Sequence, residues 1–97
     1  MYAENVNYLH KYKFLIKIKN LPFVEKVILF GSRARGTQLS RSDIDLAILC
    51  PTATQNQWHQ ILDIVEKADT LLLIDCLNFD TIDHEFKERI LTDGVIL

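Results

Sequence analysis

Three runs of β-branched and large apolar residues stand out along the chain, each bounded by polar or turn-forming residues. They cover residues 24–30, 43–50 and 71–79. Gly31 follows the first run and Pro51 the second, as turn-forming residues do at the ends of strands. Runs of this length and composition are typical of strands buried in a sheet. A shorter run at 95–97 resembles the start of a fourth strand.

Helical spacing marks three other segments. The first spans residues 5–19 and is predicted to end before Pro22, because proline restricts the backbone of the residue that precedes it. The clearest signal is the i, i+3, i+4, i+7 stripe of Trp58, Ile61, Leu62 and Val65. The last segment is predicted to begin at Asp80 or Thr81 as its capping residue and to close at Gly94. Its apolar face would consist of Ile82, Phe86, Ile90 and Leu91.

The order of these elements is helix, strand, strand, helix, strand, helix. Residues 31–42 form a polar loop between the first two strands, with room for a single helical turn. A regular doubly wound sheet would place a full helix there. The pattern therefore predicts a small α/β (α+β) fold, in which helices flank a mixed β-sheet. With 97 residues and 11.3 kDa, residues 1–97 are expected to form a single domain.

Charge and composition narrow the classes of function. Eleven Lys and Arg residues stand against 13 Asp and Glu, a net charge of −2, so nucleic-acid binding through a basic groove is not expected. No apolar run approaches the roughly 20 residues that span a bilayer, and no N-terminal export signal is present. Cys50 and Cys76 lie in apolar runs without the spacing of a zinc site, as buried thiols do. We expect a cytoplasmic protein that does not contact a membrane.

Carboxylates mark the second and third predicted strands. Asp43 and Asp45 are two residues apart, so both side chains project from the same face of a strand. Two neighbouring carboxylates repel each other and need a proton, an arginine or a metal ion beside them. Asp75 lies within another apolar run, and it would join the pair if the two strands are neighbours. Three such carboxylates suit two Mg²⁺ ions and a phosphate substrate, with Asp75 as general base for an attacking hydroxyl.

The segment between the first two strands suits a phosphate group. Gly31 and Ser32 follow the first strand, and open α/β sheets place their ligands at strand ends. Glycine lets the backbone approach a phosphate closely, and a following helical turn directs N–H groups at it. Thr37 and Ser40 offer hydroxyl donors, and Arg33, Arg35 and Arg41 offer positive charge. Gly31 to Gly36 also imitates a nucleotide-binding P-loop, but Thr37 stands where that motif requires lysine, so we reject this alternative.

The run Gly31-Ser32-Arg33-Ala34-Arg35-Gly36, followed by Ser42-Asp43-Ile44-Asp45-Leu46, resembles the signature of the DNA polymerase beta-type nucleotidyltransferase superfamily. Within it, the sequence is most similar to the minimal nucleotidyltransferases, or MNT proteins. The resemblance implies the nucleotidyltransferase fold, with Gly31, Ser32 and Arg33 binding the nucleotide. It implies that Asp43, Asp45 and Asp75 form the catalytic set and hold Mg²⁺.

The resemblance also implies a biological role. MNT proteins are antitoxins paired with HEPN-domain toxins, so it implies transfer of AMP from ATP to a tyrosine of such a partner, within a hetero-oligomer. Length agrees with a protein acceptor, because 97 residues leave little room for a second lobe that grips a nucleic acid.

Other interpretations stay open from the sequence. The aspartates would form structural ion pairs with Arg33, Arg35 or Arg41 if they held no metal. A non-catalytic antitoxin would neutralise its partner by binding alone. Transfer to a small molecule such as an aminoglycoside, or to an RNA end, is a third alternative, although relatives with those substrates carry additional domains.

Overall fold

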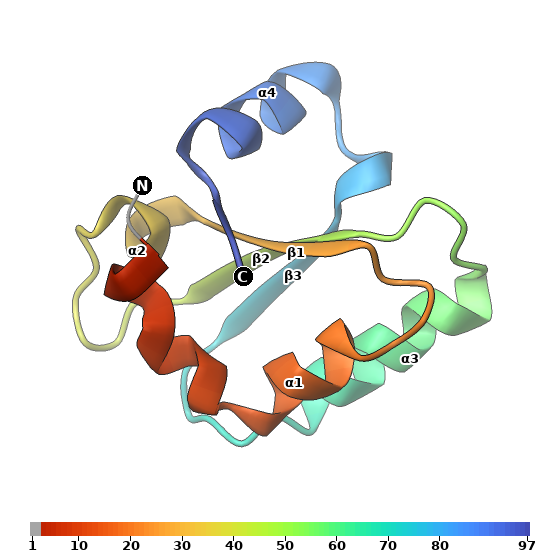
Figure 1. Ribbon diagram of the computed structural model, residues 1–97, viewed down its shortest axis with the longest axis horizontal. Coiled ribbons are helices and arrows are strands. Elements are labelled where there is room, and N and C mark those ends of the chain that lie inside the picture. The colour runs from red at the N-terminus through yellow and green to blue at the C-terminus, as the bar shows by residue number, and fades with distance from the viewer. Residues whose placement is uncertain (1–2) are drawn as a thin grey trace.

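The computed structural model describes residues 3–97 and contains one four-stranded sheet (Figure 1). Helix α4 covers one face of the sheet, and α1 and α3 cover the other. The elements are η1 (Ala3–Lys11), α1 (Lys13–Lys19), β1 (Lys26–Phe30), α2 (Gly31–Arg35), β2 (Ile44–Leu49), α3 (Gln55–Glu66), β3 (Ile74–Asn78), η2 (Phe79–Thr81), α4 (His84–Asp93) and β4 (Val95–Ile96). Three layers result, in the order α4, sheet, α1 with α3.

The strand order is β3-β2-β1-β4. β1 pairs antiparallel with β2 and with β4, whereas β2 pairs parallel with β3. The parallel pair is connected through α3, and the antiparallel pair β1–β2 through the short α2 and the loop that follows it. The prediction of a small mixed sheet flanked by helices is confirmed, including the strand at the C-terminal end.

Strand β2 packs against both helical layers. Ile44, Leu46 and Ile48 belong to the main core with residues of α1 and α3. Ala47, on the alternate face, joins the smaller core under α4 with Ile90. The period of two in a strand therefore directs Asp45 to the α4 side, at the end of the sheet where α2 begins.

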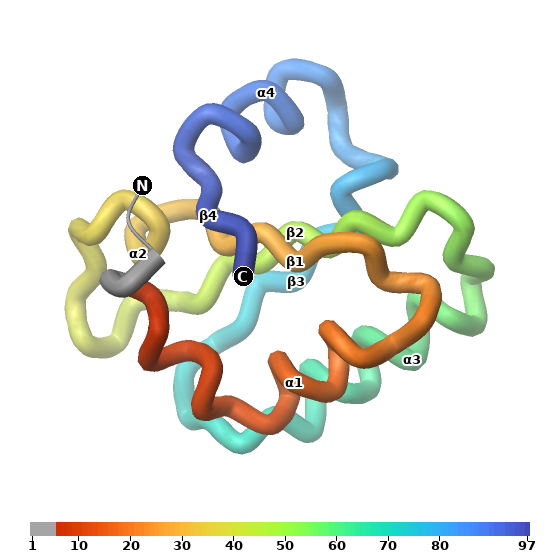
Figure 2. Tube along the Cα trace, viewed as in Figure 1, coloured from red at the N-terminus to blue at the C-terminus, as the bar shows by residue number. Residues whose placement is uncertain are grey.

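The N-terminal segment is not the single helix predicted over 5–19. Tyr12 has an extended backbone (φ −76°, ψ 128°), which separates the 3₁₀-helix η1 from α1 (Figure 2). The break lets both segments bury apolar side chains against the same core. These side chains are Val6 and Leu9 from η1, and Phe14, Leu15 and Ile18 from α1.

The C-terminal helix also differs from its prediction. Its cap is Asp83, whose carboxylate accepts a hydrogen bond from the Phe86 N–H at 2.8 Å. Asp80, the predicted cap, instead accepts a hydrogen bond from the Cys50 N–H at 3.2 Å and so links η2 to the end of β2. Leu91 is 62% exposed and does not belong to the buried face, whereas Gly94 ends the helix as predicted.

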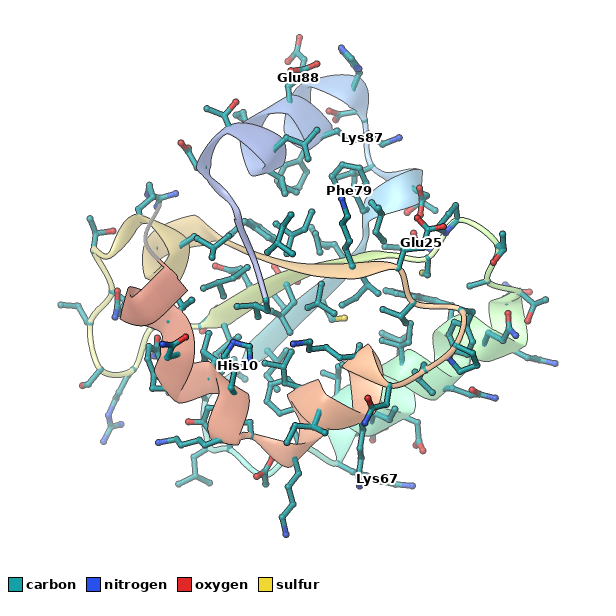
Figure 3. All side chains as sticks on the ribbon, in the orientation of Figure 1. His10, Glu25, Lys67, Phe79, Lys87 and Glu88 are labelled. Atoms are coloured by element: carbon teal, nitrogen blue, oxygen red, sulfur yellow. The ribbon has the colours of Figure 1, made fainter. Side chains whose placement is uncertain are left out.

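The side chains in Figure 3 illustrate how polar groups stay outside these layers. Lys67 forms an ion pair with Asp63 on the outer side of α3 at 3.1 Å, and Glu88 points away from the sheet on α4. None of the helices within residues 3–97 has the length and apolar character that a membrane crossing needs.

Candidate active site

The three predicted carboxylates lie at one end of two adjacent strands. Asp43 directly precedes β2, Asp45 lies within it, and Asp75 lies within β3. The parallel pairing sets Asp45 directly opposite Asp75 in register. Residues in register on adjacent strands project to the same face, so both carboxylates lie on the α4 side of the sheet. Asp75 was expected to join the aspartate pair if the two strands are neighbours, and β2 and β3 are neighbours.

Gly31 brings the phosphate-binding candidate segment against these carboxylates. Its neighbour Phe30, the last residue of β1, pairs with Asp45 of β2. Gly31 itself has φ +75°, a left-handed conformation that glycine adopts without strain. A Cβ at this position would overlap a carboxylate oxygen of Asp45 and lie 3.1 Å from its Cγ. The absence of a side chain at Gly31 thus makes the close approach of β1 and the Asp45 carboxylate possible.

Helix α2 starts at this contact and forms the single turn predicted for the loop. The Ser32 carbonyl, in its first turn, accepts a hydrogen bond from the Thr37 N–H at 3.0 Å. Gly36 closes the turn in a left-handed conformation with φ +75°. The Ser42 hydroxyl accepts a hydrogen bond from the Leu39 N–H at 2.9 Å, which shapes the return of the chain toward Asp43. Ser32 is half-buried next to Gly31, in a position consistent with its predicted contact to a nucleotide.

The carboxylates act on one another electrostatically. Burial raises the pKa of Asp45 above its usual value of 3.8, and the negative charges of Asp75 and Asp43 raise that pKa further. The positive charges of Arg35 and Arg33 lower it. The arginines therefore do not offset the combined effect of burial and the neighbouring carboxylates on the pKa of Asp45, and a cation beside Asp45 would lower that pKa.

The donor set fits Mg²⁺ in kind, because carboxylate oxygens are the ligands that this ion takes from proteins. Asp45 and Asp75 face each other in register, and the charge of Asp43 reaches Asp45. Within residues 3–97, however, no three His, Cys, Asp or Glu side chains are close enough together to hold a metal ion without moving. Metal binding by these three residues stays a prediction.

Arg33 occupies a different place from the one expected of a nucleotide-binding residue. It is only 5% exposed. Its Nε and Nη2 donate to the Ser42 carbonyl at 3.1 and 2.9 Å, its Nη2 to the Ser40 carbonyl at 3.3 Å, and its Nη1 to the Tyr8 hydroxyl at 2.6 Å. The guanidinium group therefore fastens the loop after α2 to η1, and this geometry does not support nucleotide binding by Arg33.

Arg35 and Arg89 supply the accessible positive charge beside Gly31. They line an open pocket of about 240 Å³ between α2 and α4, together with Phe30, Gly31, Phe86, Ile90 and Asp93. Arg89 was not predicted as a site residue, because it lies in the C-terminal helix outside the Gly-Ser segment. Its position next to Gly31 depends on how α4 crosses the sheet, and no local sequence signal reveals it.

The two cysteines contribute packing. Cys50 is buried and Cys76 is half-buried against the main core, and both are free thiols. Burial, with a smaller effect from the negative charge of Asp75, raises the pKa of Cys76 to about 12. A thiol with so high a pKa is almost entirely protonated at neutral pH, so Cys76 is not a nucleophile of the site although it adjoins Asp75.

Comparisons with known proteins agree with this geometry. The chain is 26% identical over 96 residues to a Methanocaldococcus jannaschii protein named "Putative protein adenylyltransferase", a match covering 97% of this chain and 94% of that protein. A solved toxin–antitoxin structure with AMP-PNP is similar with a TM-score of 0.65 and 25% identity, over 86% of this chain and 68% of that chain.

A further solved structure contains the tri-AMPylated HEPN toxin of Shewanella oneidensis in complex with an MNT antitoxin. It matches with a TM-score of 0.59 and 21% identity, over 99% of this chain and 71% of that chain, and at this identity it shows the shared fold. Residues 13–97 match the family model described as polymerase beta, nucleotidyltransferase. That match includes the Gly-Ser segment and all three aspartates, and it confirms the resemblance seen in the sequence: the chain belongs to the polymerase beta nucleotidyltransferase family and is a nucleotidyltransferase.

Proposed function

We propose that this chain is an antitoxin that transfers AMP from ATP, with Mg²⁺, to a tyrosine hydroxyl of a partner HEPN-domain toxin. The observation that carries the proposal is the register of Asp45 with Asp75, directly beside Gly31. This arrangement suits a nucleotide phosphate between a glycine turn and a carboxylate cluster. The name of the archaeal relative and the nucleotide in the toxin–antitoxin neighbour support the same reaction.

Each residue of the site has a separate task in this proposal. Asp43 and Asp45 would hold Mg²⁺, which supplies positive charge that stabilises the negative charge of the reacting phosphates. Gly31 and Ser32 would bind phosphate oxygens at the start of α2. Asp75 would lie beside the acceptor and take the proton from its hydroxyl. Arg33 would keep the loop from Ser40 to Ser42 in place and so position Asp43 without touching the nucleotide.

The proposed reaction is a displacement at the α-phosphorus of ATP. The acceptor oxygen attacks the α-phosphorus of ATP and forms a new P–O bond, while its proton passes to the Asp75 carboxylate. The bond from the α-phosphorus to the oxygen bridging to the β-phosphate breaks, and its electron pair leaves with pyrophosphate. The products are the AMP ester of the acceptor and pyrophosphate.

We also propose that residues 1–97 form one minimal nucleotidyltransferase domain. Two observations support this assignment. The family match covers residues 13–97, and the structure contains one four-stranded sheet. Such a domain contains the nucleotide site, whereas the surface that orients the acceptor would come from the partner protein, in a hetero-oligomer.

The direct test is incubation of the chain with ATP labelled in its α-phosphate, Mg²⁺ and the protein encoded by the adjacent gene, which the proposal expects to be a HEPN-domain toxin. We expect label on a tyrosine of the partner, no label when Mg²⁺ is chelated, and none with Asp45→Asn. Equal labelling by the wild type and Asp45→Asn would contradict the proposal.

A growth assay separates catalysis from binding. If the chain acts by transfer, a variant with Asp43→Ala and Asp45→Ala should still bind the toxin but should no longer protect cells from it. Full protection by this double variant would instead show that the chain neutralises its partner by complex formation alone.

A further inference from the structure

The pocket between α2 and α4 lies on one side of Asp45, and Asp75 lies on the other. In the strand order β3-β2-β1-β4, Asp75 belongs to β3, Asp45 to β2, and Gly31 directly follows β1. The pocket begins at Phe30 and Gly31 and extends to α4. Across the sheet, Asp75 (the proposed base) therefore comes first, followed by Asp45 with Asp43, then by Gly31, and finally by the pocket.

Nucleotidyl transfer places constraints on the two sides of the reacting phosphorus. In an in-line displacement, the attacking oxygen and the leaving oxygen lie on opposite sides of that phosphorus. With the acceptor beside Asp75 and the α-phosphate near Asp45, the leaving pyrophosphate must lie on the β1 side. The pocket at Gly31 is the space that the structure provides there.

The charges in the pocket suit such a leaving group. Arg35 contributes one guanidinium from α2 and Arg89 a second from α4, and both side chains are exposed. Among the side chains that the structure describes, neither arginine takes part in an ion pair. Arg89 lies over the face of the Phe86 ring at 5.4 Å, and Phe86 packs edge-on against Phe30 at 5.7 Å. These rings support the guanidinium group from beneath.

Asp93 is the acidic member of the pocket, one helical turn after Arg89 on α4. Its negative charge lowers the net charge of the pocket lining from +2 to +1. A polyphosphate in this pocket would therefore be attracted by the two arginines and repelled by Asp93, and the two effects can be measured separately.

We infer that Arg89 of α4 is a further binding residue of the nucleotide site, which holds the β- and γ-phosphates of the nucleoside triphosphate, and then the pyrophosphate product, from the side of this pocket opposite α2. The inference rests on the proposed transfer of AMP from ATP, and it adds α4 to the nucleotide site. Arg35 acts from the α2 side, where its charge also reaches Asp45.

The test measures binding of inorganic pyrophosphate, ATP and AMP, each with Mg²⁺, by titration calorimetry. Arg89→Gln should lower the affinity for pyrophosphate and for ATP by about tenfold, the loss expected when one charged hydrogen bond is removed. It should leave the affinity for AMP unchanged. Arg89→Lys should retain part of the affinity, because it keeps the charge. Asp93→Asn should change affinity in the opposite direction and strengthen pyrophosphate binding.

Lys17→Gln provides the matched control, since it removes one exposed positive charge from α1, on the face of the sheet opposite α4. It should leave all three affinities within twofold of the wild type. Circular dichroism verifies that every variant is folded. An Arg89→Gln variant that binds pyrophosphate like the wild type would overturn the inference. An equal loss of affinity for AMP and for ATP would also overturn it, because the pocket would then hold the nucleoside.

Failure of this inference can be told apart from failure of the proposed function. Binding of pyrophosphate through Arg89 is measured without any acceptor, so a wild type that transfers no label can still show the Arg89 effect. Conversely, label transfer that is unchanged in Arg89→Gln at limiting ATP would support the proposed function and overturn the pyrophosphate pocket.

Discussion

Gly31 and Gly36 have the same left-handed backbone, φ +75°, but their surroundings differ. A Cβ at Gly31 would overlap the Asp45 carboxylate, whereas a Cβ at Gly36 would meet nothing within 4 Å. We expect Gly36→Ala to lower the free energy of unfolding by about 1 kcal/mol, the typical cost of a left-handed alanine, and Gly31→Ala to lower it by more. Chemical denaturation measures both values.

The glycine pair also separates stability from activity. Gly31→Ala should abolish AMP transfer, because the Asp45 carboxylate must move away from β1, and Gly36→Ala should retain it. Equal losses of stability in the two variants would show that the contact with Asp45 is not decisive.

Arg33 and Arg35 allow a second comparison at the scale of single residues. Arg33→Gln leaves the carbonyls of Ser40 and Ser42 without their buried donor and should lower the free energy of unfolding by about 2 kcal/mol. Arg35→Gln changes an exposed side chain and should alter the free energy of unfolding by less than about 0.5 kcal/mol, while it weakens the binding of ATP. Thermal melts and ATP titrations of both variants decide the matter. The opposite result, a stable Arg33→Gln that has lost ATP, would return Arg33 to the nucleotide site.

Among the secondary-structure elements, α4 depends on the cap at Asp83, whereas the sequence pattern located this cap two or three residues too early, at Asp80 or Thr81. The carboxylate of Asp83 accepts from the Phe86 N–H, and Phe86 in turn packs against Phe30 at the edge of the pocket. Asp83→Ala should therefore lower the free energy of unfolding by about 1 kcal/mol. Glu85→Ala, an exposed change in the same turn, should stay within about 0.5 kcal/mol of the wild type. Urea denaturation provides the comparison, and equal effects would mean that the cap is not important.

Helix α4 also explains why the site extends beyond the Gly-Ser segment. Its inner face packs on β1 through Ile90, and this contact brings Arg89 beside Gly31. Two residues before Arg89, Lys87 lies over the Phe79 ring at 5.7 Å (Figure 3), so neighbouring cations on one helix have different surroundings. Spacing along the helix alone does not distinguish them.

For the molecule as a whole, the carboxylate cluster is a region of unfavourable charge that a cation would stabilise. The pKa of Asp45 is raised above its usual value of 3.8, so ionisation of this carboxyl costs more free energy in the folded chain than in the unfolded chain. The linkage sign follows: stability falls as pH rises through this range, and the unfavourable contribution is absent at lower pH. Without metal, Asp45→Asn should thus melt at a higher temperature than the wild type at pH 7, and this advantage should disappear in acid.

Addition of Mg²⁺ should reverse that difference. An ion that binds only the folded state raises its stability by an amount that grows with the logarithm of the ion concentration relative to the dissociation constant, and at 100 times that constant the gain is about 2.7 kcal/mol. The wild type should therefore gain melting temperature with Mg²⁺, and Asp45→Asn should gain little. Scanning calorimetry with Mg²⁺ and with EDTA measures this. A wild type that does not respond to Mg²⁺, with or without ATP, would contradict metal binding at this cluster.

Local sequence was sufficient to predict the order and type of the main elements, since strand and helix periodicities are local properties. It was also sufficient to predict the Gly-Ser segment and the aspartate pair, although only Asp45 lies within β2 and Asp43 directly precedes it. The break at Tyr12 and the cap at Asp83 were missed, because packing of both N-terminal segments on one core and the turn of η2 depend on distant residues.

Which of these features lie next to one another depends on the packing of the whole chain. Pairing of β2 with β3 set Asp75 opposite Asp45, burial turned Arg33 into a support of the loop, and the crossing of α4 brought Arg89 to Gly31. The physical reason is that a strand or helix specifies the face on which a side chain lies but not its neighbour. Neighbours are chosen by burial of apolar faces across the whole chain, and the charge of the site follows from that choice.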